Sequence, residues 1–332
     1  MVNQTTNMEQ GIGENFRPYH LDTHREQIKN KKYVNKLTTV SAAITKYVTD
    51  GCYLATGGFG CNRIATALLH EIVRQGKKNL CFSGHTTTHD CQILVAGECF
   101  DRCDVAYIVG LEARGLSKMA RKYFESGKVQ TTEWSNAALA FRYKAAAMGV
   151  SFLPSKVLLG TDTFKYSAAK ITICPFTGDK YAAIPALSPD VAVIHVHQAD
   201  IYGNCVIRGL NNSDSDLAKA SKHVIITTEQ IVSNDEIRRS PWQTAIPYWS
   251  VDAVIPVPYG SYPGNMEGEY FSDERHLQEW LTAEQDETTY RAFIKKYILD
   301  TKDFYEYLQL CGGIERINQL REEELLIKRS SP

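Results

Sequence analysis

Residues 54–60 read Leu-Ala-Thr-Gly-Gly-Phe-Gly, an apolar run that passes directly into a glycine-rich segment. The apolar residues that follow have the spacing of one helix face, and Gly76 stands where a glycine commonly ends a helix. The stretch therefore predicts a strand, a tight turn and a helix. Because glycine has no Cβ, such a turn can adopt positive φ and a ligand can approach its amide groups closely.

Two interpretations of this glycine turn remain open at the level of sequence. Its spacing matches neither the third glycine of G-x-G-x-x-G nor the Gly-Lys-Ser/Thr ending of a phosphate loop. It is either a ligand-facing turn or a tight strand-to-helix connection that serves packing alone.

The rest of the chain repeats the alternation of apolar runs and amphipathic stretches. Helices are predicted between a cap at Thr39 and a glycine stop at Gly51, over 117–126 and over 136–148, where Gly149 follows. Strands are predicted at residues 52–56, 79–82, 105–109, 156–159, 191–196, 223–228 and 253–257. This order indicates an α/β fold, with a mostly parallel sheet and helices on both faces.

The composition divides the chain into three parts. Residues 1–37 are polar with little periodicity and are expected to form an N-terminal extension. Residues 38–272 contain the strand signals and are expected to form the α/β domain. Residues 273–332 are expected to be a helical C-terminal extension, with helices over 274–282, 287–300 and 302–310.

Charge and cysteine content exclude several classes of protein. The 37 basic and 38 acidic residues nearly cancel and no stretch concentrates one sign, so nucleic acid is not an expected partner. The N-terminus lacks the apolar core of a secretion signal and no run reaches the length of a membrane span, which predicts a cytoplasmic protein and no membrane partner. The nine cysteines are expected to be reduced, buried thiols. A less favoured alternative is a zinc site drawn from His85, His89, Cys91, Cys99 and Cys103.

Several further pieces occur in a fixed order along the chain. They are YVTDG at 47–51, the glycine turn, EIVRQG at 71–76, AAA at 145–147 with FLP at 152–154, DVAVIH at 190–195 with Asp200, Gly203-Asn204, Glu229 with Ile231 and DEIR at 235–238, VDAV at 251–254, PYG at 258–260, and Pro263, Gly268, Tyr270 and Asp273. In this order they resemble the A subunit of family I CoA-transferases, in particular the glutaconate CoA-transferase-like branch. The likeness spans about residues 38–312.

The resemblance implies an activity shared between two polypeptides. Such transferases move CoA between a thioester and a carboxylic acid, which can be dicarboxylic, through an enzyme-bound anhydride and a glutamyl-CoA thioester. The nucleophilic glutamate belongs to a separate B subunit, so no catalytic residue is expected on this chain. A heterotetramer or larger assembly is expected, with CoA thioester as substrate, no bound cofactor and no metal.

The resemblance also gives the glycine turn a role in the cleft between the subunits. Its amides are expected to face a developing oxyanion, so that Gly58→Val should lower activity more than stability. The segment from Ser83 to Asp90 follows a strand end and is expected to line the acyl pocket, with Asp90 as a helix cap as the structural alternative. The substrate-binding and CoA-binding residues predicted from this turn and the neighbouring loops are Gly57, Gly58, Phe59, Gly60, Ser83, Gly84, Arg114 and Gly115.

Arg114 bears on the choice of substrate. Residues 111–115 read Leu-Glu-Ala-Arg-Gly, where glutaconate-type relatives tend to have small and polar residues before a glycine. Arg114 can hold a distal carboxylate with a planar pair of hydrogen bonds, or it can pair with Glu112 on a solvated loop.

Other chemically capable residues have a simpler structural interpretation. His195 and His197 share one face of a predicted strand, and satisfied core histidines are the favoured interpretation over paired ligands or bases. Glu133 and Glu229 are expected to serve as caps or core hydrogen-bond acceptors. Two rivals to the transferase remain: a hydrolase or decarboxylase on the same scaffold, and a non-catalytic assembly subunit.

Overall fold

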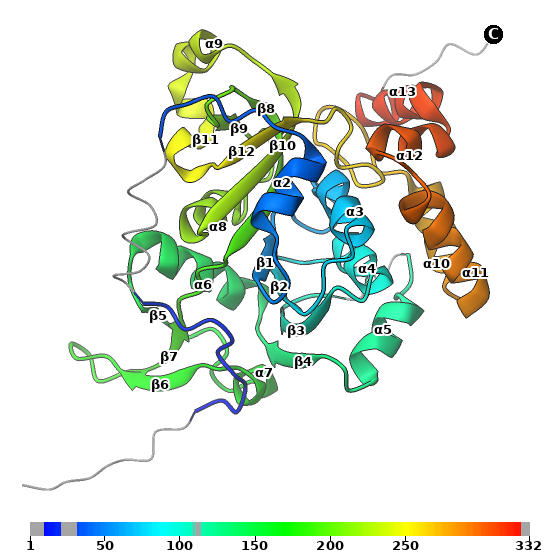
Figure 1. Cartoon of the computed structure of the whole chain (residues 1–332). Coiled ribbons are helices and arrows are strands. Elements are labelled where there is room, and N and C mark those ends of the chain that lie inside the picture. Colours follow the sequence, from blue (N-terminus) through cyan, green and yellow to red (C-terminus); the bar gives the residue numbers. More distant parts are fainter. Residues whose placement is uncertain (1–9, 21–31, 109, 111–113, 327–332) are drawn as a thin grey trace, which may run out of the picture.

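The computed structural model describes residues 10–20, 32–108, 110 and 114–326. Within these ranges a nine-stranded sheet forms the centre of the molecule (Figure 1). Its parallel strands lie in the order β4-β3-β2-β1-β8-β10-β12. Their bounds are β1 Tyr53–Thr56, β2 Leu80–Gly84, β3 Phe100–Val105, β4 Gln130–Glu133, β8 Val191–Ala199, β10 His223–Ile231 and β12 Ala253–Pro256. The short strands β9 Cys205–Val206 and β11 Thr244–Ile246 add an antiparallel pair beside the end of β8.

A second, antiparallel sheet lies below the first in Figure 1. It has the order β5-β7-β6, with bounds Phe152–Ser155, Lys180–Pro185 and Lys170–Ile173. The N-terminal segment runs along this unit, because the amides of Gly11 and Gly13 donate to the carbonyls of Ala169 and Ser167. The described part of the predicted extension is therefore packed on the body of the protein.

Helices cover both faces of the central sheet. One face is covered by α2 Val40–Tyr47, α3 Thr66–Arg74, α4 His89–Ala96 and α5 Lys118–Glu125, and the other by α6 Asn136–Met148 and α8 Asp214–Ala220. Strand β1 shows how the sequence produces two cores, since Leu54 points into the first while Tyr53 and Ala55 point into the second. The shorter helices α7 Asp162–Tyr166 and α9 Asn234–Arg239 lie outside these layers.

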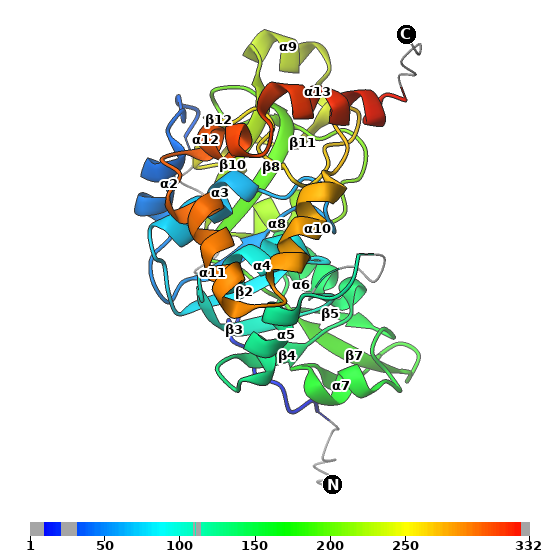
Figure 2. The same cartoon turned by 90° about the vertical axis from the view of Figure 1, so that its right-hand side faces the viewer.

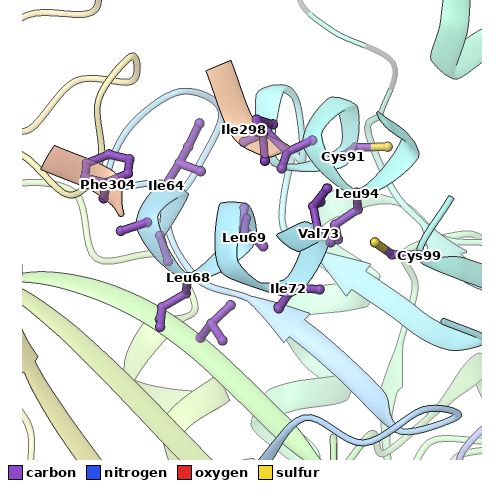
Figure 3. Packing of buried hydrophobic residues seen from close by; sticks show 14 of the residues in the cluster. Ile64, Leu68, Leu69, Ile72, Val73, Cys91, Leu94, Cys99, Ile298 and Phe304 are labelled. Carbon is purple, nitrogen blue, oxygen red and sulfur yellow. The ribbon is translucent and has the colours of Figure 1, made fainter. Parts of the chain in front are cut away.

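Three C-terminal helices form an outer layer over α3 and α4 (Figure 2). They are α10 Glu274–Ala283, α11 Glu287–Ile294 continued by a π-helical turn over Lys295–Leu299, and α12 Phe304–Leu310. The last helix, α13 Gly313–Glu324, lies beside α12. Ile298 and Phe304 from this layer pack beside Ile64 and Leu69 (Figure 3). The tail therefore completes the first core and does not stand apart from the α/β body.

Most of the predicted elements are confirmed, and the exceptions have local causes. Helix α6 occupies 136–148, and Gly149 ends it at φ +73°. Two predicted strands are wrong: β3 ends at Val105, so residues 106–108 follow it, and 156–159 is a turn after β5. Val109, the last residue of the first prediction, lies outside the described residues. In both places an apolar run continues beyond the strand into a connection. The predicted strand 223–228 extends to Ile231, and the helix α13 was not predicted. The domain boundaries at 37 and 272 stay a prediction.

Among the described residues, no helix combines the length and apolar character that crossing a bilayer requires.

Candidate functional site

The candidate site lies where the parallel strands end. Strands β1, β2 and β3 end at Thr56, Gly84 and Val105, and the loops that follow meet at one edge of the sheet. This is the edge at which open α/β sheets bind their ligands. The predicted glycine turn follows β1 directly and faces the loop after β2, since the amide of Gly60 donates to the carbonyl of Thr86 over 2.9 Å.

All four amides of the glycine turn are engaged within the chain. Gly57 donates to the carbonyl of Val193 over 2.9 Å, Gly58 to the Asp214 carboxylate over 2.8 Å, and Phe59 to the carbonyl of Asn62 over 3.0 Å. With the bond from Gly60 the turn has no amide left to offer. The expectation that these amides stabilise an oxyanion is therefore not met in this conformation, and the turn is a fixed wall.

The glycines of the turn serve two different purposes. A Cβ on Gly57 would lie 2.4 Å from Oδ1 of Asp214, and one on Gly58, at φ +83°, would lie 2.5 Å from the carbonyl oxygen of Asn62. Both positions require glycine for packing, so folding should suffer first from Gly58→Val. Gly60 also has positive φ, +64°, but its Cβ position meets nothing within 4 Å. Gly60 is therefore the residue of the turn whose Cβ side faces open space.

The loop after β2 is tied to the glycine turn. The ring of Phe59 meets the ring of His85 edge to face, with centroids 5.1 Å apart. Gly84 is closely packed, because a Cβ there would lie 2.3 Å from Oγ1 of Thr56. Ser83 is fully buried and its hydroxyl lies 2.8 Å from the Tyr143 hydroxyl on α6, so this predicted binding residue points into the second core.

Asp90 stands in the first turn of α4, after Thr88 at the N-cap position. Its carboxylate accepts from the backbone N–H of Thr88 and from the hydroxyl of Thr56, both over 2.7 Å. Burial raises the pKa of Asp90 to about 6, and these hydrogen bonds offset part of that rise. The bond from Thr88 holds the start of α4, as the cap interpretation predicted, and the bond from Thr56 ties α4 to β1, which it did not predict.

Arg114 lies between the glycine turn and α10. Its guanidinium donates to both oxygens of Glu274, and its Nη1 lies 2.8 Å from Sγ of Cys61. Hydrogen bonding to Glu274 raises the pKa of Arg114, and the same bond lowers the pKa of Glu274. Glu112, the partner considered from sequence, lies outside the described residues. The neighbouring Gly115 has φ +101° and open space around its Cβ position.

A small cavity joins these parts. It is lined by Cys61, which follows the turn, by residues at the start of α4, by residues of α10 and by the segment before α5, among them Thr88, His89, Gln92, Arg114 and Leu277. Of the predicted residues, Arg114 and Gly115 line this cavity. Phe59 and Gly60 instead meet the β2 loop at His85 and Thr86, and Ser83 is directed into the second core.

The histidines of β8 are core residues, as the sequence indicated. Nε2 of His195 lies 2.7 Å from the Glu229 carboxylate and its Nδ1 lies 2.8 Å from Thr227. His197 donates from Nε2 to the carbonyl of Glu267 and accepts at Nδ1 from a backbone amide, while burial lowers its pKa to about 4. Glu229 also accepts from the Tyr270 hydroxyl, which confirms its expected role as a core acceptor.

Sequence reasoning missed the side chains that hold the site from a distance. Asp214 and Glu274 lie 150 or more residues from the glycine turn and carry no local signal. Arg63 could have been noticed, because it follows the turn directly.

The cysteines fit the prediction of buried thiols. Eight are buried, Cys174 is intermediate, and all nine are free. Cys91, Cys99 and Cys103 pack in the first core. In the described part of the chain, no group of three or more His, Cys, Asp or Glu side chains is arranged to hold a metal ion.

Comparisons with known proteins agree on one family. The family described as Coenzyme A transferase matches residues 37–256. The chain is 33% identical to the A subunit of glutaconate CoA-transferase from Acidaminococcus fermentans over 307 residues, which cover 86% of this chain and 94% of that relative. It is 35% identical to the A subunit of 3-oxoadipate CoA-transferase from Pseudomonas knackmussii over 276 residues, 82% of this chain and 96% of that relative. The crystal structure of the Acidaminococcus glutaconate coenzyme A-transferase superposes with a TM-score of 0.82 at 32% identity, covering 86% of this chain and 95% of that chain.

Proposed function

Because the chain belongs to the coenzyme A transferase family, we propose that it is the A subunit of an acyl-CoA:carboxylate CoA-transferase built from two kinds of subunit. The observation that carries the proposal is the match to the A subunit of a CoA-transferase over 86% of this chain and 94% of that relative, with a TM-score of 0.82. The family resemblance and the α/β fold expected from the sequence are confirmed by these comparisons.

The proposed reaction divides its chemistry between the subunits. In the B subunit, a glutamate carboxylate attacks the thioester carbonyl, the C–S bond breaks, and CoA leaves as a thiolate while a mixed anhydride remains. The thiolate then attacks the glutamyl carbonyl, which releases the first acid and leaves a glutamyl-CoA thioester. An acceptor carboxylate repeats the two steps in reverse. This chain supplies one wall of the cleft, and coenzyme A enters as part of the substrate.

The predicted binding residues keep different roles in this proposal. Gly60 and Phe59 form the half-buried part of the wall, and Gly57 and Gly58 hold that wall in place from behind. Gly84 and Ser83 support the adjoining loop through Thr56 and Tyr143. Arg114 and Gly115 border the wall on the side of α10. A rigid wall contributes by placing the thioester against the nucleophile of the B subunit.

Arg114 supports a dicarboxylic substrate. Glu274 already occupies its two-bond fork, with N···O distances of 2.5 and 2.6 Å. The pairing supports the proposal, because a carboxylate already lies against this guanidinium. Because Glu274 is 49% exposed at its side chain, a distal substrate carboxylate can exchange with it without opening the core.

The partner and the compartment follow from the same proposal. We infer a separate B subunit, in a heterotetramer or larger assembly that acts in the cytoplasm. The two named relatives are themselves A subunits. Their transferase activity favours this function over that of a hydrolase, a decarboxylase or an assembly subunit.

The test is thioester exchange with and without a B subunit. The purified chain alone should transfer no CoA, and co-purification with a B-type subunit should restore transfer from an acyl-CoA to an added acid. A hydroxylamine-sensitive CoA adduct should then form on a glutamate of the B subunit. Turnover by this polypeptide alone, with such an adduct on one of its own glutamates, would overturn the assignment of two subunits. Free CoA or carbon dioxide formed without an acceptor acid would instead identify a hydrolase or a decarboxylase.

A further inference from the structure

An ion pair lies directly behind the glycine turn. Nη2 of Arg63 is 2.7 Å from Oδ2 of Asp214, and the two side chains are 0% and 1% exposed. Arg63 follows the turn by three residues, whereas Asp214 is the first residue of α8. Two opposite charges that are buried in this way stay ionised only because each is paired and hydrogen-bonded.

The second oxygen of Asp214 contacts the turn itself. Oδ1 accepts the Gly58 amide over 2.8 Å, and a Cβ on Gly57 would lie 2.4 Å from the same oxygen. One carboxylate thus contacts two successive residues of the turn. A charged oxygen is a stronger acceptor than a neutral one, so this bond fixes the Gly58 peptide firmly.

Arg63 is itself held in an unusual conformation. Its φ is +58°, a region that costs a residue with a side chain and persists where surrounding contacts determine it. Those contacts are its pairing with Asp214 and the hydrogen bonds from Nη2 to the Leu210 carbonyl and from Nη1 to the His195 carbonyl. Arg63 therefore links the turn to the middle of β8 and to the loop before α8.

The loop before α8 makes another contact with the candidate site. The hydroxyl of Ser213 lies 3.0 Å from Nδ1 of His85, and the His85 ring packs against Phe59. The segment from Leu210 to Asp214 thus reaches both the turn and the loop after β2.

We propose that Asp214, backed by Arg63, is the positioning residue of this site. It sets the place of the Gly58 peptide and thereby of Gly60, the part of the wall that faces open space. The inference rests on the proposed transferase function, because the wall matters only if a thioester is placed against it. Asp214 has no assigned contact with substrate and acts through the turn.

The decisive variant removes both charges and keeps an acceptor. In the double variant Arg63→Met with Asp214→Asn, an amide oxygen can still accept from Gly58, and no unpaired charge remains buried. In the complex with the B subunit, kcat for thioester exchange should fall by about 10²-fold, the cost of a misplaced reacting group. KM for the acyl-CoA should change much less, and the chain should still fold.

A second buried ion pair supplies the matched control. Nη1 of Arg142 lies 2.6 Å from Oδ1 of Asp104, and both side chains are 0% exposed. Arg142→Met with Asp104→Asn should lower the unfolding temperature to a similar or greater extent, while the folded complex keeps its kcat. If the first double variant fails to fold, Asp214→Glu retains the charge and displaces the oxygen by one methylene, and the same loss of kcat is expected.

A readout on the isolated chain separates this inference from the proposed function. Amide hydrogen exchange at Gly58 should accelerate in Arg63→Met with Asp214→Asn and should not change in the control. Unchanged exchange at Gly58 together with unchanged kcat would overturn the inference while leaving the transferase intact. If the unmodified complex transfers no CoA, the proposed function fails, and a positioning role in catalysis fails with it even where exchange at Gly58 accelerates.

Discussion

Arg114 of the loop after β3 holds the carboxylate of Glu274, the first residue of α10, with two parallel hydrogen bonds. The pair spans 160 residues of sequence and ties the candidate site to the outer helical layer. A planar guanidinium recognises a carboxylate in this way, whereas a lysine would offer only a point charge. The pair therefore links the candidate site to α10, and it also indicates that the Arg114 guanidinium can bind a carboxylate.

The first prediction concerns the selectivity of Arg114 for a second carboxylate. Arg114→Ala should raise KM for a dicarboxylic acyl-CoA by about one to two orders of magnitude, the scale of a charge-assisted bond. Arg114→Lys should also raise it, because the two-bond fork is lost. Glu274→Ala should lower the same KM by removing the internal competitor. Steady-state kinetics on the complex with the B subunit measures all three.

A monocarboxylic acyl-CoA is the substrate control for this prediction, and its KM should hardly change. Lys122→Ala is the control variant, because Lys122 and Glu287 also join the inner and outer helical layers, over 3.0 Å, but at the surface and away from the turn. Equal responses of both substrates, or a response of neither, would leave Arg114 and Glu274 as a structural link alone.

The second prediction reverses the one made from sequence for Gly58. Gly58→Val should lower the free energy of unfolding by about 2–5 kcal/mol, because a side chain there combines left-handed strain with overpacking. The side chain would press on the carbonyl oxygens of Asn62 and Arg63, which lie 2.5 and 2.8 Å from the Cβ position. Denaturant unfolding of the isolated chain measures the loss. A variant that keeps wild-type stability but loses activity would restore the original expectation.

The third prediction isolates the exposed side of the turn by comparing two glycines with the same backbone. Gly60 and Gly76 both have φ +64° and open space around the Cβ position, but Gly76 ends α3 away from the site. Each change to Ala should cost about 1–2 kcal/mol of stability through left-handed strain. Only Gly60→Ala should also lower kcat/KM for the acyl-CoA. Parallel losses of activity in both variants would show that strain, and not contact with substrate, is responsible.

The sequence was sufficient for the architecture because local patterns determine it. Alternation between the two faces places Leu54 in one core and Ala55 in the other, and Gly149 ends α6 at the predicted residue. The glycine turn was likewise located from its own residues. Strand ends were harder to locate, as at Val105, since an apolar residue beyond a strand can still be buried by a connecting loop.

The long-range contacts that hold the site could not be predicted from sequence patterns. Glu274 and Asp214 are ordinary acidic residues near helix starts, and only the folded chain brings them to Arg114 and Gly58. The roles of the glycines were also ambiguous, because Gly58 and Gly60 look alike until the neighbours of each Cβ position are known. The turn was expected to offer free amides, and tertiary hydrogen bonds use them instead.

The last prediction concerns acid sensitivity at the contact between α3 and α12. The ring of His70 is fully buried among aromatic side chains, with its centroid 4.6 Å from that of Tyr307 and 5.7 Å from that of Phe304. Neither ring nitrogen has a hydrogen-bond partner among the described residues. Burial lowers the pKa of His70 well below its ordinary value of 6.5, and the nearby Arg74 lowers it further.

The sign of the pH dependence follows from this lowered pKa. Between the folded pKa and 6.5 the unfolded chain binds a proton that the folded chain does not, so stability is complete above pH 6.5 and falls as the pH drops below it. His70 alone contributes a slope of up to about 1.4 kcal/mol per pH unit.

His70→Phe should therefore raise the free energy of unfolding by about 1–3 kcal/mol at pH 5. The gain at pH 7.5 should be smaller and arises because the variant also removes the unsatisfied nitrogens. Urea unfolding at the two pH values measures both effects, and His20→Phe, at an exposed histidine, should change neither. The acid sensitivity should not vanish, because burial also lowers the pKa of His276 to about 4. If the difference in stability between pH 5 and pH 7.5 is the same with and without His70, the ring is not a buried neutral group, and the packing of α12 on α3 must be looser than this structure has it.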